Sequence, residues 1–353
     1  MGEKLLMKGN EAIGEAAIHA GCRYYFGYPI TPQSELTAYM ARRLLKIDGA
    51  AFVQAESEVA AINMVYGTAA VGARVMTSSS SPGISLKQEG ISYIACAELP
   101  CVIVNMMRGG PGLGSIQPAQ GDYFQATKGG GHGDYHLIVL APSSVQELVD
   151  LTVKAFDLAD KYRNPAMILG DGLLGQMMEP VDFKEREVAN LPSKNEWMIG
   201  SCTGRKARNI TPFNLDPYEL EKLVNKIGEK YKKIQDEVQY ELVNMENPDL
   251  VLVAYGTVAR VVKTAIQKAK KQGINIGLIR PITLFPFPYK IINNAADRVK
   301  KFLVSEMSLG QMVEDVRLAV NGKAEVEFYG RTGGVVISPV EILEEVKKIL
   351  EKK

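Results

Sequence analysis

Apolar runs and amphipathic stretches alternate along the first 170 residues of the chain. Short runs of aromatic, branched and other apolar residues predict strands at 23–28, 51–54, 74–77, 101–106, 136–140 and 166–169. Stretches with a helical apolar period lie between them and predict helices at 10–20, 31–46, 57–72, 82–98 and 143–162. Unbroken apolar strands that alternate with helices predict a parallel sheet, with every strand buried and helices on both faces.

Polar residues mark where several of these helices are expected to begin. Asn10 is expected to cap the first helix, and Thr31, with Pro32 at the first helical position, to begin the second. Ser143 and Ser144 precede Gln and Glu residues three positions later, so they predict overlapping capping boxes.

The alternation stops near residue 180 and resumes near residue 248. Residues 180–215 are polar and have no clear period, so we interpret them as a connecting arm. A charged amphipathic helix is expected from Asp216 to about Val243. Beyond it, strands are predicted at 250–254, 274–279, 302–304 and 326–329, and helices at 257–272, 310–320 and after Ser338.

The predicted fold is therefore α/β: a doubly wound parallel sheet followed by a smaller α/β domain. The expected division is a first domain at 1–180, a connecting arm and helix at 181–247, and a second domain at 248–353.

Composition and charge exclude several classes of protein. Among 353 residues, 41 basic side chains balance 40 acidic ones, so we expect no polybasic surface and neither a nucleic-acid nor a membrane partner. The four cysteines form no C-x-x-C pair, which argues against a disulfide framework or a four-thiolate cluster. No uncharged apolar stretch reaches the roughly 20 residues of a membrane helix. Residues 1–4 lack the basic leader of a signal peptide, so a cytoplasmic location is expected.

Candidate chemistry is sought beyond the carboxyl ends of the strands, where parallel sheets bind ligands. Thr31, at a helix start, offers a hydroxyl and free N–H groups to a small carboxylate, but the local sequence favours plain helix capping, since most capped helices bind nothing. Glu56 and Glu58 follow an apolar strand, and Glu58 is the first residue of a very apolar helix, where an acid complements the helix dipole. Alternatively, one of them is a carboxyl in apolar surroundings that hydrogen-bonds a heterocycle nitrogen.

Two glycine-rich loops are further candidates. Arg108, at a strand end before the glycine-rich run 109–114, suits a carboxylate or phosphate clamp, but the run is not G-x-G-x-x-G. The loop at 129–134 carries His132 and is either a mobile lid or a plain surface loop. The segment 170–172 resembles the start of a metal and diphosphate motif, but no suitably placed Asn follows it. We therefore interpret Gly172 as a turn and expect no metal site on this chain.

Together, several segments resemble the α subunit of the 2-oxoacid:ferredoxin oxidoreductases. These segments are 7–12, 27–35, 57–61, 77–83, 121–122 and 280–286, and the resemblance as a whole extends over nearly the full chain. Within that family the resemblance is nearest to the enzymes acting on 3-methyl-2-oxobutanoate, with the 2-oxoglutarate enzymes close behind. It implies that the first domain is the pyrimidine-binding domain of a thiamine-diphosphate enzyme and the second a transketolase-C-like domain.

The resemblance also implies roles for individual residues. Glu58, rather than Glu56, would hydrogen-bond N1′ of the cofactor's aminopyrimidine. Thr31 and Arg108 would contact the substrate carboxylate. The loop before Thr31 would contribute three cofactor-binding residues: Tyr28, Pro29 and Ile30.

A hetero-oligomer is implied as well. A β subunit would hold the diphosphate of thiamine diphosphate and its Mg²⁺, and [4Fe-4S] clusters would lie in partner subunits, which include a γ and a ferredoxin-like δ subunit. The implied reaction is oxidative decarboxylation of a branched-chain 2-oxo acid with coenzyme A, giving acyl-CoA and CO₂ and reducing ferredoxin. Two alternatives stay open: a 2-oxoglutarate enzyme, and a non-catalytic assembly subunit that completes a partner's site.

Overall fold

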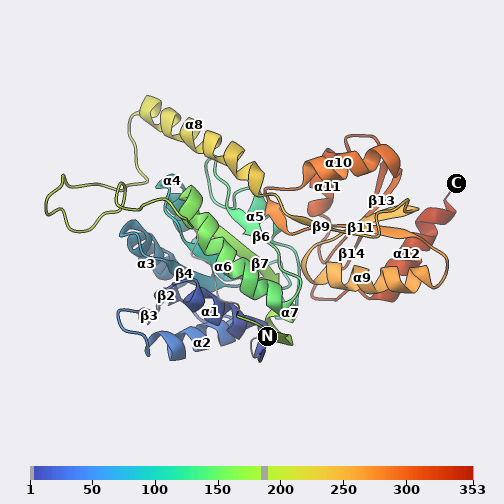
Figure 1. Ribbon diagram of the computed structural model, residues 1–353, viewed down its shortest axis with the longest axis horizontal. Helices are drawn as coiled ribbons and strands as arrows, with labels where there is room; N and C mark the ends of the chain where they lie inside the picture. The colour runs from blue at the N-terminus through green and yellow to red at the C-terminus, as the bar shows by residue number, and fades with distance from the viewer. Residues whose placement is uncertain (1–3, 184–189, 353) are drawn as a thin grey trace.

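The structure is a computed structural model that describes residues 4–183 and 190–352 (Figure 1). The expectation about a leader at the N-terminus concerns residues 1–3, which lie outside the described residues. The same holds for residues 184–189 of the expected connecting arm.

Seven strands form the larger sheet, in the order β12-β6-β7-β5-β4-β2-β3. Their bounds are β2 (Tyr24–Gly27), β3 (Ala51–Gln54), β4 (Val75–Ser79), β5 (Val102–Met107), β6 (Ile138–Leu140), β7 (Ala166–Asp171) and β12 (Thr283–Phe285). Neighbouring strands are parallel except β12, which pairs antiparallel with β6. The predicted α/β class with a doubly wound parallel sheet is confirmed.

Two groups of helices cover this sheet. The helices are α1 (Gly9–His19), α2 (Ser34–Leu44), α3 (Glu58–Ala70), α4 (Ser81–Cys96), α5 (Tyr123–Thr127), α6 (Val145–Tyr162) and α7 (Gly172–Gln176). From β2 the chain moves outward to β3, and from β3 it crosses back over β2 to β4 and then β5. Because such crossovers are right-handed, α2 lies on one face and α3 and α4 lie on the other. The contacts agree: α1 packs against α2 and α6, and α3 packs against α4.

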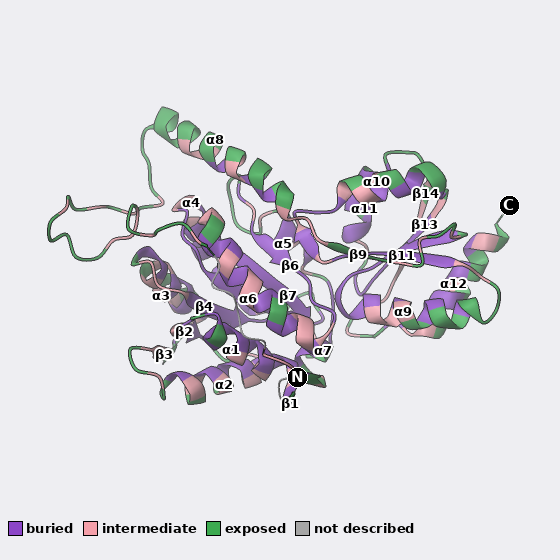
Figure 2. Ribbon diagram, viewed as in Figure 1, coloured by how far each residue is buried: buried purple, intermediate pink, exposed green. Residues whose placement is uncertain are grey.

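A five-stranded sheet forms the second unit, to the right in Figure 1, in the order β14-β13-β10-β11-β9. Its strands are β9 (Tyr240–Val243), β10 (Leu250–Val253), β11 (Ile276–Pro281), β13 (Lys301–Glu306) and β14 (Glu325–Gly330). Its helices are α9 (Gly256–Lys270), α10 (Tyr289–Arg298), α11 (Met312–Val320) and α12 (Pro339–Glu351). Figure 2 shows the inner strands of both sheets buried between their helices.

The segment between the two sheets is only partly as predicted. Residues 190–216 form no helix or strand, and α8 (Pro217–Ile234) then runs along the top of the molecule in Figure 1. The helix predicted to reach Val243 is wrong in its last third: a 3₁₀ turn, η1 (Gln235–Glu237), ends it, and β9 follows. The alternating exposure of β9 suits an edge strand, and it pairs antiparallel with β11. A small separate ribbon pairs β1 (Leu5–Lys8) with β8 (Met178–Val181).

Two predicted helix starts are wrong for physical reasons that the local sequence hides. Asn10 lies inside α1 and is buried, because its Nδ2 donates to the Pro32 carbonyl at 2.8 Å instead of capping the helix. Thr31 does not cap α2, which begins at Ser34. The Gln33 N–H donates to the Ile30 carbonyl at 3.1 Å, so residues 30–33 close a turn before the helix.

Two smaller expectations also fail. The strand predicted as buried at 51–54 is β3, whose residues are half-buried or exposed because it lies at the edge of the sheet. Gly172 is the first residue of α7 rather than a turn. Asp171 caps that helix by accepting from the N–H groups of residues 173 and 174.

Buried polar contacts join the two units. Arg280, at the end of β11, is 1% exposed and donates to Glu147 of α6 at 3.0 and 2.5 Å and to Glu241 of β9 at 2.7 Å. Asp315 of α11 accepts from Tyr123 of α5 at 2.6 Å. These contacts, with the pairing of β12 and β6, hold the carboxyl ends of both sheets in a fixed relation.

Candidate functional site

The strand order places a crevice between β2 and β4. The chain leaves these two neighbours in opposite directions, and ligands of doubly wound sheets bind at such switch points, beyond the carboxyl ends of the strands. The loops that begin there are 28–33 after β2, 55–57 after β3 and 80 after β4, with 108–118 after β5 close by.

Glu58 enters this crevice as the first residue of α3. Ser57 fixes the helix start, because its hydroxyl accepts from the Ala60 N–H at 3.1 Å. Glu58 is 6% exposed, whereas its neighbour Glu56 is exposed. Within residues 4–183 and 190–352, the Glu58 carboxyl has no hydrogen-bond or ion-pair partner. A buried carboxyl of this kind is available to a ligand.

The start of α4 leaves room for that carboxyl. A Cβ at Gly83 would overlap Ser79 Oγ and lie 2.7 Å from Glu58 Oε1, far inside van der Waals contact. About two turns later, a Cβ at Gly90 would overlap the side chain of Ile62, which is four residues after Glu58 on α3. The two helices therefore approach closely along a line that starts at Glu58.

Arg108 contacts the loop after β2 through the backbone of that loop. Arg108 is 8% exposed, and its guanidinium donates to the Thr31 carbonyl and to the Leu113 carbonyl, both at 2.9 Å. The backbone N–H of Arg108 also donates to Ser81 Oγ at 3.1 Å. Thr31 itself is exposed, as are Tyr28 and Pro29, while Ile30 is half-buried. Arg108 thus holds two loops at the mouth of the crevice.

Several buried polar atoms around the crevice have no partner in the described part of the chain. They are Gln33 Nε2, Ser79 Oγ, Ser80 Oγ and Arg108 Nε. Buried donors and acceptors in folded proteins are nearly always satisfied, so such a group points to a polar ligand or ordered water. Together with the free carboxyl of Glu58, they fit an aromatic heterocycle that carries hydrogen-bonding nitrogens.

A buried hydroxyl network supports the floor of this crevice. Tyr25 OH lies 2.6 Å from Ser78 Oγ and 2.9 Å from Thr37 Oγ1, and Ser78 Oγ donates to Gln33 Oε1 at 2.6 Å. Burial raises the pKa of Tyr25 to about 12, so this phenol stays protonated.

A cleft of about 430 Å³ opens beside Arg108, between the two units. Asp122 lines it from the first unit, and Ser308, Gln311 and Thr332 line it from the second. Burial raises the pKa of the Asp122 carboxyl, although hydrogen bonds from Ser81 and Asn105 oppose this. The cleft is wide enough for a small organic acid and continues the crevice toward the second unit.

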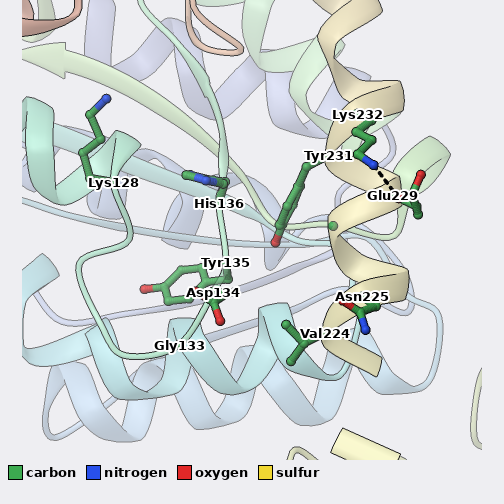
Figure 3. A pocket seen from close by; sticks show the side chains of 11 residues that line it. Lys128, Gly133, Asp134, Tyr135, His136, Val224, Asn225, Glu229, Tyr231 and Lys232 are labelled. Atoms are coloured by element: carbon green, nitrogen blue, oxygen red, sulfur yellow. Dashed lines mark hydrogen bonds and ion pairs between the residues drawn. The ribbon is translucent and has the colours of Figure 1, made fainter. Parts of the chain in front are cut away.

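The second glycine-rich loop borders a different hollow, of about 440 Å³, against α8 (Figure 3). His132 is exposed and does not line it. His136 does, and Tyr231 of α8 faces it with the ring centroids 5.3 Å apart. Tyr135 OH accepts from the Gly131 N–H at 2.8 Å, which fastens the middle of the loop. Whether the loop acts as a lid stays a prediction.

One residue at the crevice was missed from the sequence. Lys87 lies on α4, four residues after Gly83, and is completely buried. A lysine in a largely apolar helix was the available signal, because lysine is almost never fully buried without a partner.

Membrane-spanning helices and clusters of metal ligands are both absent from the described residues. None of the helices in these ranges has the length and apolar character needed to cross a lipid bilayer. No group of three or more His, Cys, Asp or Glu side chains in residues 4–183 and 190–352 is placed to hold a metal ion.

Comparison with known families gives two matches that together span most of the chain. Residues 15–247 match the family described as pyruvate flavodoxin/ferredoxin oxidoreductase, thiamine diphosphate-binding. Residues 248–342 match pyruvate:ferredoxin oxidoreductase core domain II.

Individual proteins match over almost the full length. The chain is 52% identical to the ketoisovalerate oxidoreductase subunit VorB of Methanothermobacter thermautotrophicus, covering 98% of this chain and 97% of that one. It is 37% identical to the 2-oxoglutarate synthase subunit KorA of the same organism, covering 99% and 100%.

A solved structure is also similar. It is the 2-oxoglutarate:ferredoxin oxidoreductase from Magnetococcus marinus with 2-oxoglutarate, coenzyme A and succinyl-CoA bound, and it superposes with a TM-score of 0.85 at 27% identity. The match covers 99% of this chain and 66% of that one, so this chain spans about two thirds of the neighbour's length.

Proposed function

Because this chain belongs to the pyruvate flavodoxin/ferredoxin oxidoreductase family, we propose that it is the pyrimidine-binding subunit of an enzyme that oxidatively decarboxylates a branched-chain 2-oxo acid. The observation that carries the substrate class is 52% identity, over 98% of the chain, to a subunit named for ketoisovalerate. The reaction joins the acyl group to coenzyme A, releases CO₂ and passes two electrons to ferredoxin.

Glu58 is the residue proposed to meet the cofactor. Its carboxyl is buried, unpartnered in the described residues and placed at the switch point of the sheet. Bound there, thiamine diphosphate supplies the electron sink that decarboxylation of a 2-oxo acid requires. Glu58 holds a proton between its own oxygen and N1′ of the pyrimidine ring, in a crevice that excludes water. Tyr28, Pro29 and Ile30, in the loop after β2, are proposed to bind the cofactor from the other side of the crevice.

Arg108 and Thr31 are proposed to orient the substrate carboxylate. Arg108 Nε is buried without a partner in the described residues, and two other guanidinium nitrogens are fixed by the carbonyls of Thr31 and Leu113. A guanidinium held in this way is preorganised, so less side-chain entropy is lost when a carboxylate binds. The exposed Thr31 hydroxyl adds a donor at the same mouth.

The rest of the chemistry is proposed to lie on partner subunits. Relatives are named as subunits, which supports a multi-subunit enzyme. In this proposal a β subunit binds the diphosphate and Mg²⁺, and γ and ferredoxin-like δ subunits accompany it, with [4Fe-4S] clusters in the partners passing electrons to ferredoxin. The location proposed for the complex is the cytoplasm.

An assay of the assembled complex tests the function. The complex is supplied with coenzyme A, a low-potential electron acceptor and, in turn, 3-methyl-2-oxobutanoate, 2-oxoglutarate and pyruvate. We expect the largest kcat/KM with 3-methyl-2-oxobutanoate. A larger kcat/KM with 2-oxoglutarate would replace the substrate class with that of the 37% identical relative.

A further inference from the structure

Lys87 is a buried basic group that the proposed function does not yet use. It is 0% exposed, and its Nζ donates to Thr77 Oγ1 at 2.6 Å and to the Ser78 carbonyl at 3.1 Å, both at the end of β4. An ammonium has three N–H donors, so within the described residues one of them has no partner. A group of this kind is costly to bury, and its position needs an explanation.

The packing of α3 on α4 places Lys87 beside Glu58. Residues four apart on a helix lie on the same face, so Gly83 and Lys87 share one face of α4. Gly83 lies against the Glu58 carboxyl and Ser79 Oγ. The residue before Ser79 is Ser78, whose carbonyl accepts a hydrogen bond from Lys87. Farther along the same face, Gly90 packs against Ile62, one turn after Glu58 on α3. Lys87 therefore lies between the two glycine contacts that bring α4 onto α3.

We propose that Lys87 is a positioning residue for Glu58: its ammonium stabilises the Glu58 carboxylate that remains when the proton moves to the pyrimidine nitrogen. The inference rests on the proposed function of Glu58. The proton balance is simple, because Glu58 Oε–H gives its proton to N1′ and regains it on the return step. Without a nearby positive charge, a buried carboxylate left behind would be strongly disfavoured.

Among the groups that face Lys87 in the described residues, Glu58 is the charged one, and the others are neutral. Burial lowers the pKa of Lys87 to about 7, and the Glu58 carboxyl opposes that shift. From β4 it meets only the neutral Thr77 hydroxyl and the Ser78 carbonyl. From β2, Tyr25 reaches the same place through Ser78, and its pKa of about 12 keeps it neutral. The charge of Lys87 is thus sensitive near neutral pH and is coupled to Glu58.

A first test uses the cofactor-free, full-length chain labelled with [¹³C]lysine. The NMR signal of Lys87 is assigned as the one lost in Lys87→Arg, and its titration is followed in wild type, Glu58→Gln and Glu89→Gln. Glu89 is an exposed acid on the same helix and is the matched control. We expect Glu58→Gln to lower the pKa of Lys87 and Glu89→Gln to leave it unchanged. An unchanged Lys87 titration in Glu58→Gln would overturn the inference.

A second test uses the assembled enzyme and measures deuterium exchange at C2 of the cofactor against pH. Lys87→Met should lower the exchange rate about tenfold at pH 6, the effect of moving a proton equilibrium by one pKa unit. Lys87→Arg, which keeps the charge, should restore most of it. The ratio of the wild-type exchange rate to the Lys87→Met exchange rate should approach one as the pH rises well above 7. At that pH the Lys87 side chain of the wild type loses its positive charge as well.

The two proposals fail separately. If Glu58→Gln exchanges at the wild-type rate, the function proposed for Glu58 is wrong, whatever Lys87 does. If Glu58→Gln abolishes exchange while Lys87→Met matches wild type at every pH, only the role of Lys87 is wrong. A purely structural Lys87 would change thermal stability in Lys87→Met and leave the pH dependence of the ratio flat, which also overturns the inference.

Discussion

Glu58 and Gly83 meet across the contact between α3 and α4, where a Cβ at residue 83 would lie 2.7 Å from Glu58 Oε1. The glycine is needed for space rather than for backbone freedom, because its φ is not among the positive ones. The carboxyl keeps its place only while α4 presents no side chain there. The position of the proposed acid therefore depends on a residue that contributes no chemistry of its own.

Substitution of Gly83 should displace that carboxyl. In Gly83→Ala the new methyl group overlaps Ser79 Oγ and crowds Glu58, so we expect weaker thiamine diphosphate binding in the assembled complex, measured by calorimetry. Gly67→Ala is the matched control, since Gly67 lies inside α3 and a Cβ there meets nothing within 4 Å. That control should raise stability by about 0.5–1 kcal/mol and leave binding intact. Unchanged binding in Gly83→Ala would contradict the close approach of α3 and α4.

Removal of the Glu58 carboxyl should slow proton chemistry at the cofactor. We expect Glu58→Gln to reduce C2 deuterium exchange about 10²–10⁴-fold, the contribution of one general acid–base contact. Glu56→Gln should exchange normally, because Glu56 is exposed two residues away. Gel filtration checks that both variants still assemble. This comparison also separates a catalytic subunit from a non-catalytic assembly subunit, in which neither change would affect exchange.

The ion pairs of Arg280 should dominate the contact between the two units. Arg280→Met leaves Glu147 and Glu241 without their shared partner, but water reaches both carboxylates and Glu241 keeps its pair with Lys263. The expected loss is therefore about 1.5–3 kcal/mol, the contribution of a hydrogen bond to a charged group. We expect that loss in the free energy of unfolding measured in urea. Lys348→Met, which breaks an exposed pair with Glu345, should leave the unfolding midpoint where it is.

A fall in pH should weaken the ion pair between Arg280 and Glu147, which joins the two units. Burial raises the pKa of the Glu147 carboxyl, but hydrogen bonds from Arg280 and Ser143 outweigh this and hold it below the usual 4.5. A carboxyl with a lowered pKa in the folded state contributes stability that is complete above pH 4.5 and is lost as the pH falls further. Thermal unfolding followed from pH 6 to pH 3 should show this loss in wild type. A Glu147→Gln variant should show a shallower fall; equal slopes would rule out the contribution.

Local patterns predicted most of the strands and helices, and the failures share a cause. Strands such as β10 are unbroken apolar runs, so burial alone identifies them. The strand β12 could not be predicted, because it is only three residues long and lies just after β11. Those residues become a strand only by pairing with β6, more than 140 positions earlier in the sequence. Thr31 was misplaced because the turn at 30–33 and a capped helix start look alike in sequence.

The candidate site was predicted to a similar degree. Thr31 and Arg108 were found because both follow strands, and the structure brings them together through a backbone carbonyl that no pattern specifies. Glu58 was distinguished from Glu56 only by resemblance, and its burial is consistent with that choice. Lys87 was missed because its environment is built by α3 and β4, which are distant from it in sequence. The roles of all these residues stay predictions until the variants above are measured.

The pairing of β12 with β6 has a practical consequence for anyone dissecting this protein. A polypeptide cut after residue 247 would keep six strands of the larger sheet but lose the strand that closes its β6 edge. Open edges recruit strands from other molecules, so that fragment should precipitate or form intermolecular sheets. The C-terminal unit thus protects the first unit against aggregation.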